Sequence, residues 1–350
     1  MNRERLLEAI DDAEPIQRWD LSALDLRGAD LSGATFEDVT FAGDQLRDVD
    51  FTEANLVKCR FVGCTLTGAR LRHATFAYCD LRQADLSGAE LTATTFAESQ
   101  LDGARFVDME LPVPVFVRSS LRGASFAKSR LDRVRMLEVD THEMNLAGAT
   151  LTQATYYQAD FRAVTLTDTT LDRCVLVDSR FGARDLSGLV APYGQFTKCD
   201  LAGVDLRGAR VPNANFGEAR LAGADLREVE GTAAIFMGAD LSEARLDQGC
   251  FRSGIFVEAN LTATGLARAD LHQAVFHRAR CESASFAGAD LTYAEMHQAD
   301  LRGADFTGAT LFRTRFHRTR EDGAIFGPGR RIALGDDEKL ARAEAFQPPP

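Results

Sequence analysis

The chain has 350 residues, a formal net charge of −12 at pH 7 and a sequence pI near 5.1. This acidic surplus argues against direct binding to nucleic-acid phosphates or to an anionic membrane. The sequence contains no run of about 18 apolar residues, and its first residues lead into an acidic segment and not into the apolar core of a signal peptide, so we expect a cytoplasmic protein.

The first eighteen residues are typical of a helical cap. Leu6, Leu7 and Ile10 stand at helical spacing among charged residues, and Pro15 ends the pattern. A solenoid exposes an apolar cross-section at each end, so a covering element at residues 1–18, with Trp19 beside it, makes physical sense.

From Leu21 to Phe326 a large apolar residue recurs at every fifth position without insertion or deletion. Of the 62 sites in this register, 53 are Leu or Phe. A period of five fits neither an α-helix nor a flat strand, so the backbone must turn regularly and stack coil on coil. We therefore predict one long repeat domain over residues 19–326.

Units such as Ala29-Asp30-Leu31-Ser32-Gly33 and Ala84-Asp85-Leu86-Ser87-Gly88 resemble the pentapeptide-repeat family, whose signature is A(D/N)LXX. The resemblance covers about residues 19–326. It implies an all-β fold, a right-handed quadrilateral β-helix with four pentapeptides per coil and roughly 15 coils. The central Leu or Phe and the small residue two positions before it are then expected to point inward.

The C-terminal tail, residues 327–350, leaves the register at Gly327-Pro328-Gly329. We expect a brief helix between Asp336 and Phe346 and a frayed end at Pro348 to Pro350. Capping of the solenoid and dimerisation are both open as roles for this tail.

If each coil takes twenty residues, the sequence separates into four columns, and one column is dominated by Phe. Two segments that contain proline, Glu110 to Val115 and Leu189 to Gly194, are interpreted as kinks or bulges, or alternatively as loops that contact a partner.

Outward positions beside the Phe column carry an unusual number of apolar residues, where the other faces are mostly polar. One explanation is that β-branched residues favour strands and tolerate partial exposure. The other is a surface that binds a protein partner or a second copy of the chain. The candidate partner-binding residues are Val115, Val117, Leu137, Tyr157, Val175, Val177, Ile235, Met237, Ile255, Val257 and Val275.

Beyond these apolar positions, His277, His297 and His317 follow one another at twenty-residue spacing. Three aligned imidazoles are a weak candidate for a divalent metal site, but an exposed polar column is the preferred interpretation, and we predict no metal. No CxxC pair occurs among the seven cysteines, most of which fall on inward positions and are expected to be structural.

No catalytic motif stands apart from the repeat, so we expect neither an enzyme nor a cofactor. The favoured function is a non-catalytic, bacterial-type interaction scaffold or adaptor. The resemblance also implies two alternatives. One is a DNA mimic that inhibits or protects DNA gyrase, which the interleaved Asp and Arg residues make less favourable. The other is a secretion-associated accessory or effector protein.

Overall fold

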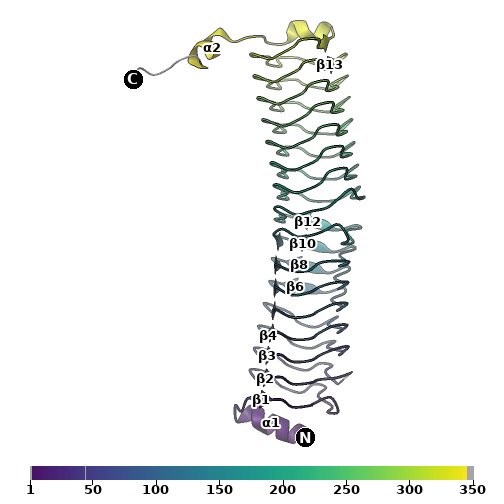
Figure 1. The fold of residues 1–350 in the computed structure, drawn as a ribbon, viewed down its shortest axis with the longest axis vertical. Coiled ribbons are helices and arrows are strands. Elements are labelled where there is room, and N and C mark those ends of the chain that lie inside the picture. The colour runs from purple at the N-terminus through teal and green to yellow at the C-terminus, as the bar shows by residue number, and fades with distance from the viewer. Residues whose placement is uncertain (1, 44, 345–350) are drawn as a thin grey trace, which may run out of the picture. The chain divides into compact units, whose positions relative to one another are not determined.

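The fold is a parallel β-solenoid of about 16 turns, as the computed structural model of residues 2–43 and 45–344 shows (Figure 1). Residues twenty positions apart lie on neighbouring coils, so that Phe36 pairs with Leu56 and Leu56 pairs with Phe76. The predicted fold class and the twenty-residue register are therefore confirmed.

Many of the pentapeptides form a tight turn whose hydrogen bonds explain the repeat signature. In the unit around Phe51, the Ala54 N–H donates to the Phe51 carbonyl at 2.9 Å, and Glu53 between them has a φ of 59°. The outward Asp50 side chain accepts the Thr52 N–H at 2.8 Å. An Asp or Asn before the central residue thus satisfies a turn N–H that the neighbouring coil does not reach.

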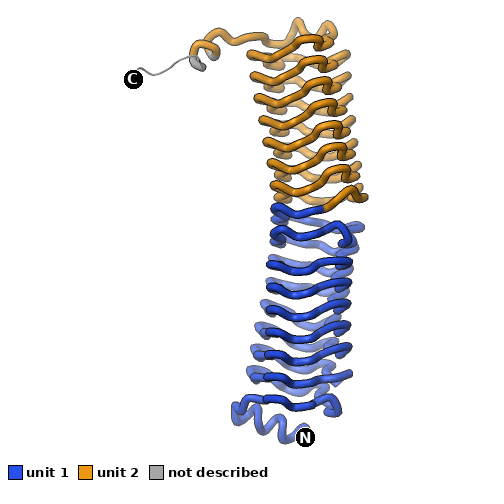
Figure 2. Tube along the Cα trace, in the orientation of Figure 1, with its two compact units in different colours: residues 1–180 blue, residues 181–350 orange. Residues whose placement is uncertain are grey.

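Contacts between residues divide the chain into two compact units, Met1–Arg180 and Phe181–Pro350 (Figure 2). The division falls inside the repeat domain predicted over residues 19–326. Each unit is described separately below as unit 1 and unit 2.

Unit 1 begins with helix α1 (Arg3–Asp11), whose first turn is capped by the Asn2 side chain. Leu6 and Ala9 of this helix are buried. The first coil begins at Ile16, three residues before the predicted boundary, because Ile16 already pairs with Phe36.

The strands of unit 1 form two parallel sheets. The eight-stranded sheet has the order β1-β2-β3-β4-β5-β7-β9-β11, and the four-stranded sheet has the order β12-β10-β8-β6. Their bounds are β1 (Ile16–Gln17), β2 (Thr35–Glu37), β3 (Asn55–Val57), β4 (Thr75–Ala77), β5 (Thr95–Ala97), β6 (Glu110–Pro112), β7 (Val115–Val117), β8 (Arg130–Asp132), β9 (Arg135–Leu137), β10 (Thr150–Thr152), β11 (Thr155–Tyr156) and β12 (Thr170–Asp172).

Unit 2 continues the same register mostly through single β-bridges, such as that between Ile235 and Ile255. Its two strands, β13 (Asp305–Phe306) and β14 (Ile325–Phe326), pair with each other. They are followed by the 3₁₀ helix η1 (Pro328–Ile332) and by helix α2 (Glu338–Glu344). The end of the expected helix at Phe346 and the expected frayed end at Pro348 to Pro350 lie outside the described residues.

Part of the tail covers the last coil of unit 2. Leu334 bridges Arg315, and the Phe316 N–H donates to the Leu334 carbonyl at 2.8 Å. The Arg330 guanidinium lies 4.6 Å from the centre of the Phe316 ring and binds Glu321 at 3.1 Å. Through these contacts Arg330 and Leu334 lie against the last coil.

The core consists of the inward residues, and the Phe column forms stacks of parallel rings within each unit. In unit 1 the Phe76, Phe96 and Phe116 rings follow one another at 5.1 Å. In unit 2 the stack runs from Phe196 to Phe276, with spacings of 4.8 to 5.1 Å. Buried rings at this spacing gain dispersion contacts in addition to the apolar area that they bury.

The kinks expected at two proline-containing segments are not found there, and that interpretation is wrong. Pro112 lies in β6, which pairs with β8 in regular register. It follows the central residue Leu111, at the position where the equivalent Thr52 N–H goes to the Asp50 side chain and not to a neighbouring coil, so a missing N–H costs little. Pro192 is the second residue of a turn closed by the Gly194 N–H and the Ala191 carbonyl, followed by Tyr193 with a φ of 56°. This is the place that a type II turn gives to proline.

None of the helices in residues 2–43 and 45–344 combines the length and the apolar character that crossing a membrane would require.

Candidate functional site

The apolar candidates of unit 1, called here the unit 1 stripe, lie along the eight-stranded sheet and the coil that follows it. Val115 and Val117 flank the buried Phe116 in β7 and are themselves half-buried. Leu137 and Tyr157 are more exposed, at 40% and 56%. The stripe is not continuous, because Arg135 pairs with Val115. Its six members are Val115, Val117, Leu137, Tyr157, Val175 and Val177.

The apolar candidates of unit 2, called the unit 2 stripe, form a tighter group. Ile235 bridges Ile255, and Ile255 bridges Val275, so three aliphatic side chains follow one another on consecutive coils. Met237 is 52% exposed, whereas the others are half-buried. The five members are Ile235, Met237, Ile255, Val257 and Val275.

Charged residues beside both stripes are paired across neighbouring coils. In unit 1, Arg118 donates to Glu98 at 2.6 Å. In unit 2, Arg278 binds Glu258 at 2.7 Å, and Lys198 lies 3.6 Å from Glu218. The border of the unit 2 stripe therefore carries both signs of charge.

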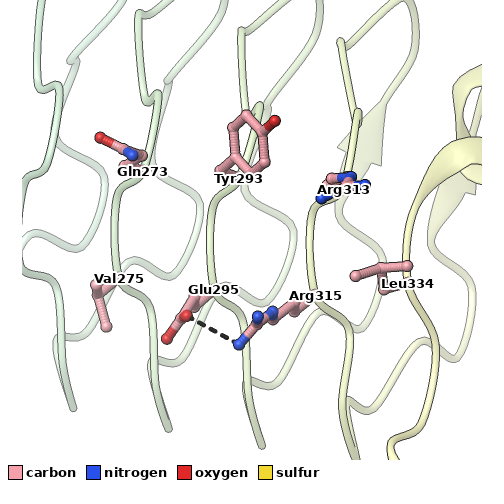
Figure 3. A pocket seen from close by; sticks show the side chains of 7 residues that line it. All are labelled: Gln273, Val275, Tyr293, Glu295, Arg313, Arg315 and Leu334. Carbon is pink, nitrogen blue, oxygen red and sulfur yellow. Dashed lines mark hydrogen bonds and ion pairs between the residues drawn. The ribbon is translucent and has the colours of Figure 1, made fainter.

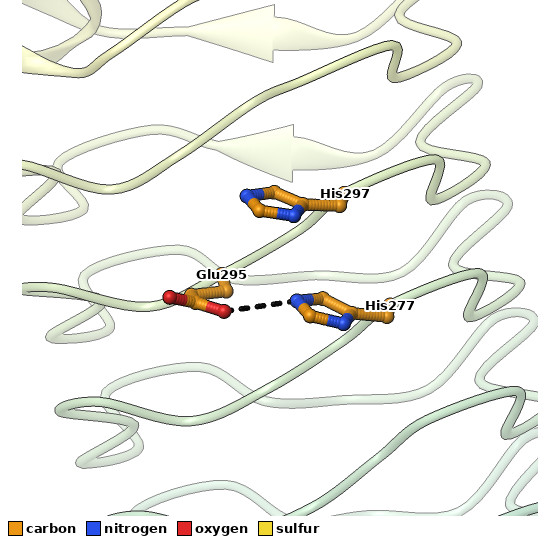
Figure 4. A group of neighbouring side chains, drawn as sticks. All are labelled: His277, Glu295 and His297. Carbon is orange, nitrogen blue, oxygen red and sulfur yellow. Dashed lines mark hydrogen bonds and ion pairs between the residues drawn. The ribbon is translucent and has the colours of Figure 1, made fainter. Parts of the chain in front are cut away.

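On the last coil of the unit 2 stripe and on the coil that follows it, His277, Glu295 and His297 form a cluster (Figure 4). The His277 Nε2 lies 3.0 Å from the Glu295 Oε2, and the rings of the two histidines are stacked at 4.6 Å with an angle of 5°. Burial lowers the pKa of His297, with a further contribution from the charge on His277. The sequence placed Glu295 beside the histidine column but did not reveal this contact.

His317, the third histidine of the predicted column, has a different environment. Its side chain is 1% exposed, and its Nδ1 accepts the Asp337 backbone N–H at 3.1 Å. The His317 ring meets His297 edge-on, with centroids 5.7 Å apart. The structure thus brings His277 and His297 near Glu295, with a hydrogen bond between His277 and Glu295, while His317 contacts the C-terminal segment.

A pocket of about 410 Å³ borders this cluster (Figure 3). Glu295 belongs to both, and its second oxygen, Oε1, accepts a hydrogen bond from Arg315 Nη1 at 3.3 Å. The lining residues are Gln273, Val275, Tyr293, Glu295, Arg313, Arg315 and Leu334.

Many outward aspartates bind an arginine two residues later, a pattern that the sequence analysis missed. In unit 2, Arg227 donates through Nε and Nη2 to the Asp225 carboxylate at 2.8 and 2.5 Å. Asp205 and Arg207 make the same two-point contact. These hydrogen bonds lower the pKa of both aspartates and neutralise their charge locally.

Inward serines, threonines and cysteines form buried hydrogen bonds that sequence reasoning also missed. Ser99 Oγ donates to the Phe76 carbonyl at 3.1 Å, and Cys79 Sγ contacts the corresponding Leu56 carbonyl at 3.3 Å. Repeated Ser, Thr and Cys at the small inward position was the available signal. Burial raises the pKa of the Cys64 and Cys174 thiols to about 12, so both are uncharged at neutral pH.

Comparison with solved structures finds several pentapeptide-repeat proteins. HetL, a pentapeptide-repeat protein involved in heterocyst differentiation regulation from the cyanobacterium Nostoc sp. strain PCC 7120, is 23% identical over 94% of this chain and 98% of its own, with a TM-score of 0.19. Full-length QnrB1, a plasmid-mediated fluoroquinolone resistance protein, is 13% identical over 69% of this chain and 100% of its own, with a TM-score of 0.28. Rfr23 from the cyanobacterium Cyanothece 51142 is 24% identical over 41% of this chain and 91% of its own, with a TM-score of 0.15.

No curated protein sequence matches the chain. Two family models do match it. The pentapeptide repeat region matches residues 29–106, and the pentapeptide repeats (8 copies) match residues 145–182, 199–230, 214–252, 255–292 and 279–318. Together these matches cover more than half of the 350 residues and agree with the twenty-residue coils, so the chain belongs to the pentapeptide-repeat family.

Proposed function

We propose that this protein is a non-catalytic interaction scaffold that binds another protein through its apolar stripes. The observation that carries the proposal is the succession of Ile235, Ile255 and Val275 on three consecutive coils, next to the exposed Met237. Most other outward positions of the coils are polar. A face that met only water would not require three aliphatic residues in succession. Covering these side chains removes apolar surface from water, and this favours association.

The inner structure supports a binding role over a catalytic one. The large inward residues are packed against one another, and the Cys64 and Cys174 thiols are buried and protonated at neutral pH. Outward Asp and Arg residues such as Asp205 and Arg207 are engaged in pairs. The outward side chains, which are apolar in the stripes and charged but paired beside them, are therefore suited to contact with another protein surface.

The test introduces charge into the stripes without touching the core. The variant Ile235→Lys/Ile255→Lys targets unit 2, and Val177→Lys targets unit 1. We expect each to weaken complex formation at least tenfold, because a buried, unpaired ammonium is costly at an interface. The readouts are light scattering after size exclusion for self-association, and quantitative affinity capture from source cells for other partners.

A matched control is Val190→Lys, which changes another half-buried, outward, β-branched residue. Val190 bridges Arg210 and so belongs to a different column from Ile235. All variants should keep the melting temperature and circular dichroism of the parent protein. Support requires a complex, with a second copy or with another protein, that the control retains and the stripe variants lose. Equal behaviour of control and stripe variants, or the absence of any complex with the parent protein, would reject the proposal.

Gyrase binding by DNA mimicry is the alternative, and the charge arrangement argues against it. The Asp205 and Asp225 carboxylates bind Arg207 and Arg227, so these neighbouring coils do not present a row of uncompensated negative charges. We therefore expect no effect of the purified protein on supercoiling by DNA gyrase.

A further inference from the structure

We propose that His277, Glu295 and His297 bind a divalent transition-metal ion of the zinc class on the outer wall of unit 2. The proposal is independent of the apolar stripes. It rests on the arrangement of three side chains that offer two imidazole nitrogens and one carboxylate oxygen, a donor set that suits Zn²⁺.

The three donors lie near one another, but the parallel, stacked rings of His277 and His297 do not yet point at a common ion. One ligand atom from each of the three residues lies within 4.8 Å of the others. The His277 Nε2 and the Glu295 Oε2 are already 3.0 Å apart. Tetrahedral zinc with bonds of about 2.1 Å separates its ligand atoms by roughly 3.4 Å. His297 must therefore move its ring nitrogen toward the other two atoms by side-chain rotation.

Partial exposure permits that rotation, and the backbone holds the three residues in place. The His297 residue, whose ring must turn, is half-buried. The His277 and Glu295 side chains are 34% and 33% exposed, so these donors are open to an ion that arrives from solvent. The Arg278 N–H donates to the His297 carbonyl at 2.9 Å, which fixes the spacing of the two histidine-bearing coils. Figure 4 shows the three side chains on the outside of neighbouring coils.

Neighbouring residues orient the carboxylate. Arg315 Nη1 holds the Glu295 Oε1, and this leaves Oε2 on the side of His277. Hydrogen bonds of this kind fix ligand orientation in metal sites. The nitrogen donors favour zinc, cobalt, nickel or copper over Mg²⁺ and Ca²⁺, which prefer oxygen ligands. Three protein ligands leave a fourth tetrahedral position for water or for a donor from another molecule.

Within residues 2–43 and 45–344 this is the one group of three such side chains with ligand atoms this close together. His317 is not part of it, since its Nδ1 accepts the Asp337 N–H. The inference therefore revises the preferred sequence interpretation, an exposed polar column, for His277 and His297 only.

Metal titration of the full-length protein, purified without a histidine tag and treated with a chelator, tests the site. Co²⁺ binding is followed by its visible absorption, and Zn²⁺ affinity by competition with a chromophoric chelator. We expect one ion per chain and a higher melting temperature in the presence of Zn²⁺. His277→Ala and His297→Ala should each lower the affinity at least tenfold, and Glu295→Gln should lower it and change the Co²⁺ spectrum.

Two controls separate this site from adventitious binding. His272→Ala removes another histidine of unit 2, and Cys250→Ser removes a partly exposed thiol; both should keep the affinity of the parent protein. The proposal is overturned if the parent protein binds no stoichiometric Zn²⁺ or Co²⁺, or if binding survives His277→Ala and His297→Ala unchanged. An unchanged affinity in Glu295→Gln would remove the carboxylate from the ligand set.

Discussion

The Tyr156 hydroxyl lies inside the core of unit 1 and has no hydrogen-bond partner among the described residues. Its ring takes a place in the Phe column, paired with Met136 and packed edge-on against Phe161 at 5.2 Å. Burial raises the pKa of this phenol, so the group stays neutral. A buried hydroxyl without a partner loses its hydrogen bonds to water and gains none in the protein.

Replacing this residue by the usual occupant of the column should therefore stabilise the protein. We expect Tyr156→Phe to raise the free energy of unfolding by about 1 kcal/mol, the lower part of the cost of an unsatisfied buried hydroxyl. Urea denaturation at pH 7 measures the change. The reverse substitution Phe116→Tyr, in the same column, should lower stability. A loss of stability in Tyr156→Phe would show that the hydroxyl has a stabilising partner.

At the scale of the element, most pentapeptides have a left-handed backbone two positions after the central residue. Ala263 adopts this conformation with a φ of 56° in the turn closed by the Thr264 N–H and the Leu261 carbonyl. Glycine reaches such a φ without the steric cost of a Cβ atom. The side chain at this position is exposed, so it contributes little packing.

Ala263→Gly should consequently stabilise the protein. Relief of about 1 kcal/mol of backbone strain exceeds the loss of roughly 0.5 kcal/mol from greater freedom of the unfolded chain, which leaves a gain of about 0.5 kcal/mol. Ala259→Gly, at the buried inward position of the same pentapeptide, should instead cost roughly 1 to 2 kcal/mol. Thermal unfolding of the two variants distinguishes them. If both variants changed the stability in the same direction, backbone strain at Ala263 would not explain the result.

The five-residue repeat made the arrangement of the coils predictable from the sequence. Contacts between individual side chains could not be predicted in this way. A constant period placed Ile235 and Ile255 on one wall, and their bridge confirms it. The contact of His277 with Glu295 depends on side-chain rotamers, which a period does not specify. The kink predicted at Pro192 was wrong because the effect of a proline depends on its position in a turn. Pro192 is the second residue of a type II turn, a position that suits proline.

At the scale of the whole molecule, the charge of −12 does not translate into uniformly acidic walls, because many aspartates have an arginine two residues later. Hydrogen bonding to that arginine is the main cause of a lowered aspartate pKa in each of four pairs. The pairs are Asp80 with Arg82, Asp160 with Arg162, Asp205 with Arg207 and Asp225 with Arg227.

These pairs predict how stability depends on pH. A carboxyl group with a lower pKa in the folded than in the unfolded state stabilises the fold fully above its unfolded pKa, near 3.9 for Asp, and loses this contribution as the pH falls through the folded pKa. The melting temperature should thus change little between pH 7 and about pH 5, and should fall below about pH 4. Because the partners are largely exposed, each pair contributes little, and the effect becomes measurable through their number.

The variant in which Asp80, Asp160, Asp205 and Asp225 are all replaced by asparagine isolates this effect. Asparagine can keep the turn hydrogen bond, since Asn145 Oδ1 already accepts the Ala147 N–H at 2.9 Å in the same position of the repeat. The charge and its titration are lost, so the fall in melting temperature between pH 5 and pH 3 should be smaller than in the parent protein. High salt should reduce the difference, because it screens exposed pairs. An identical fall in both proteins would assign the acid sensitivity to other carboxyl groups.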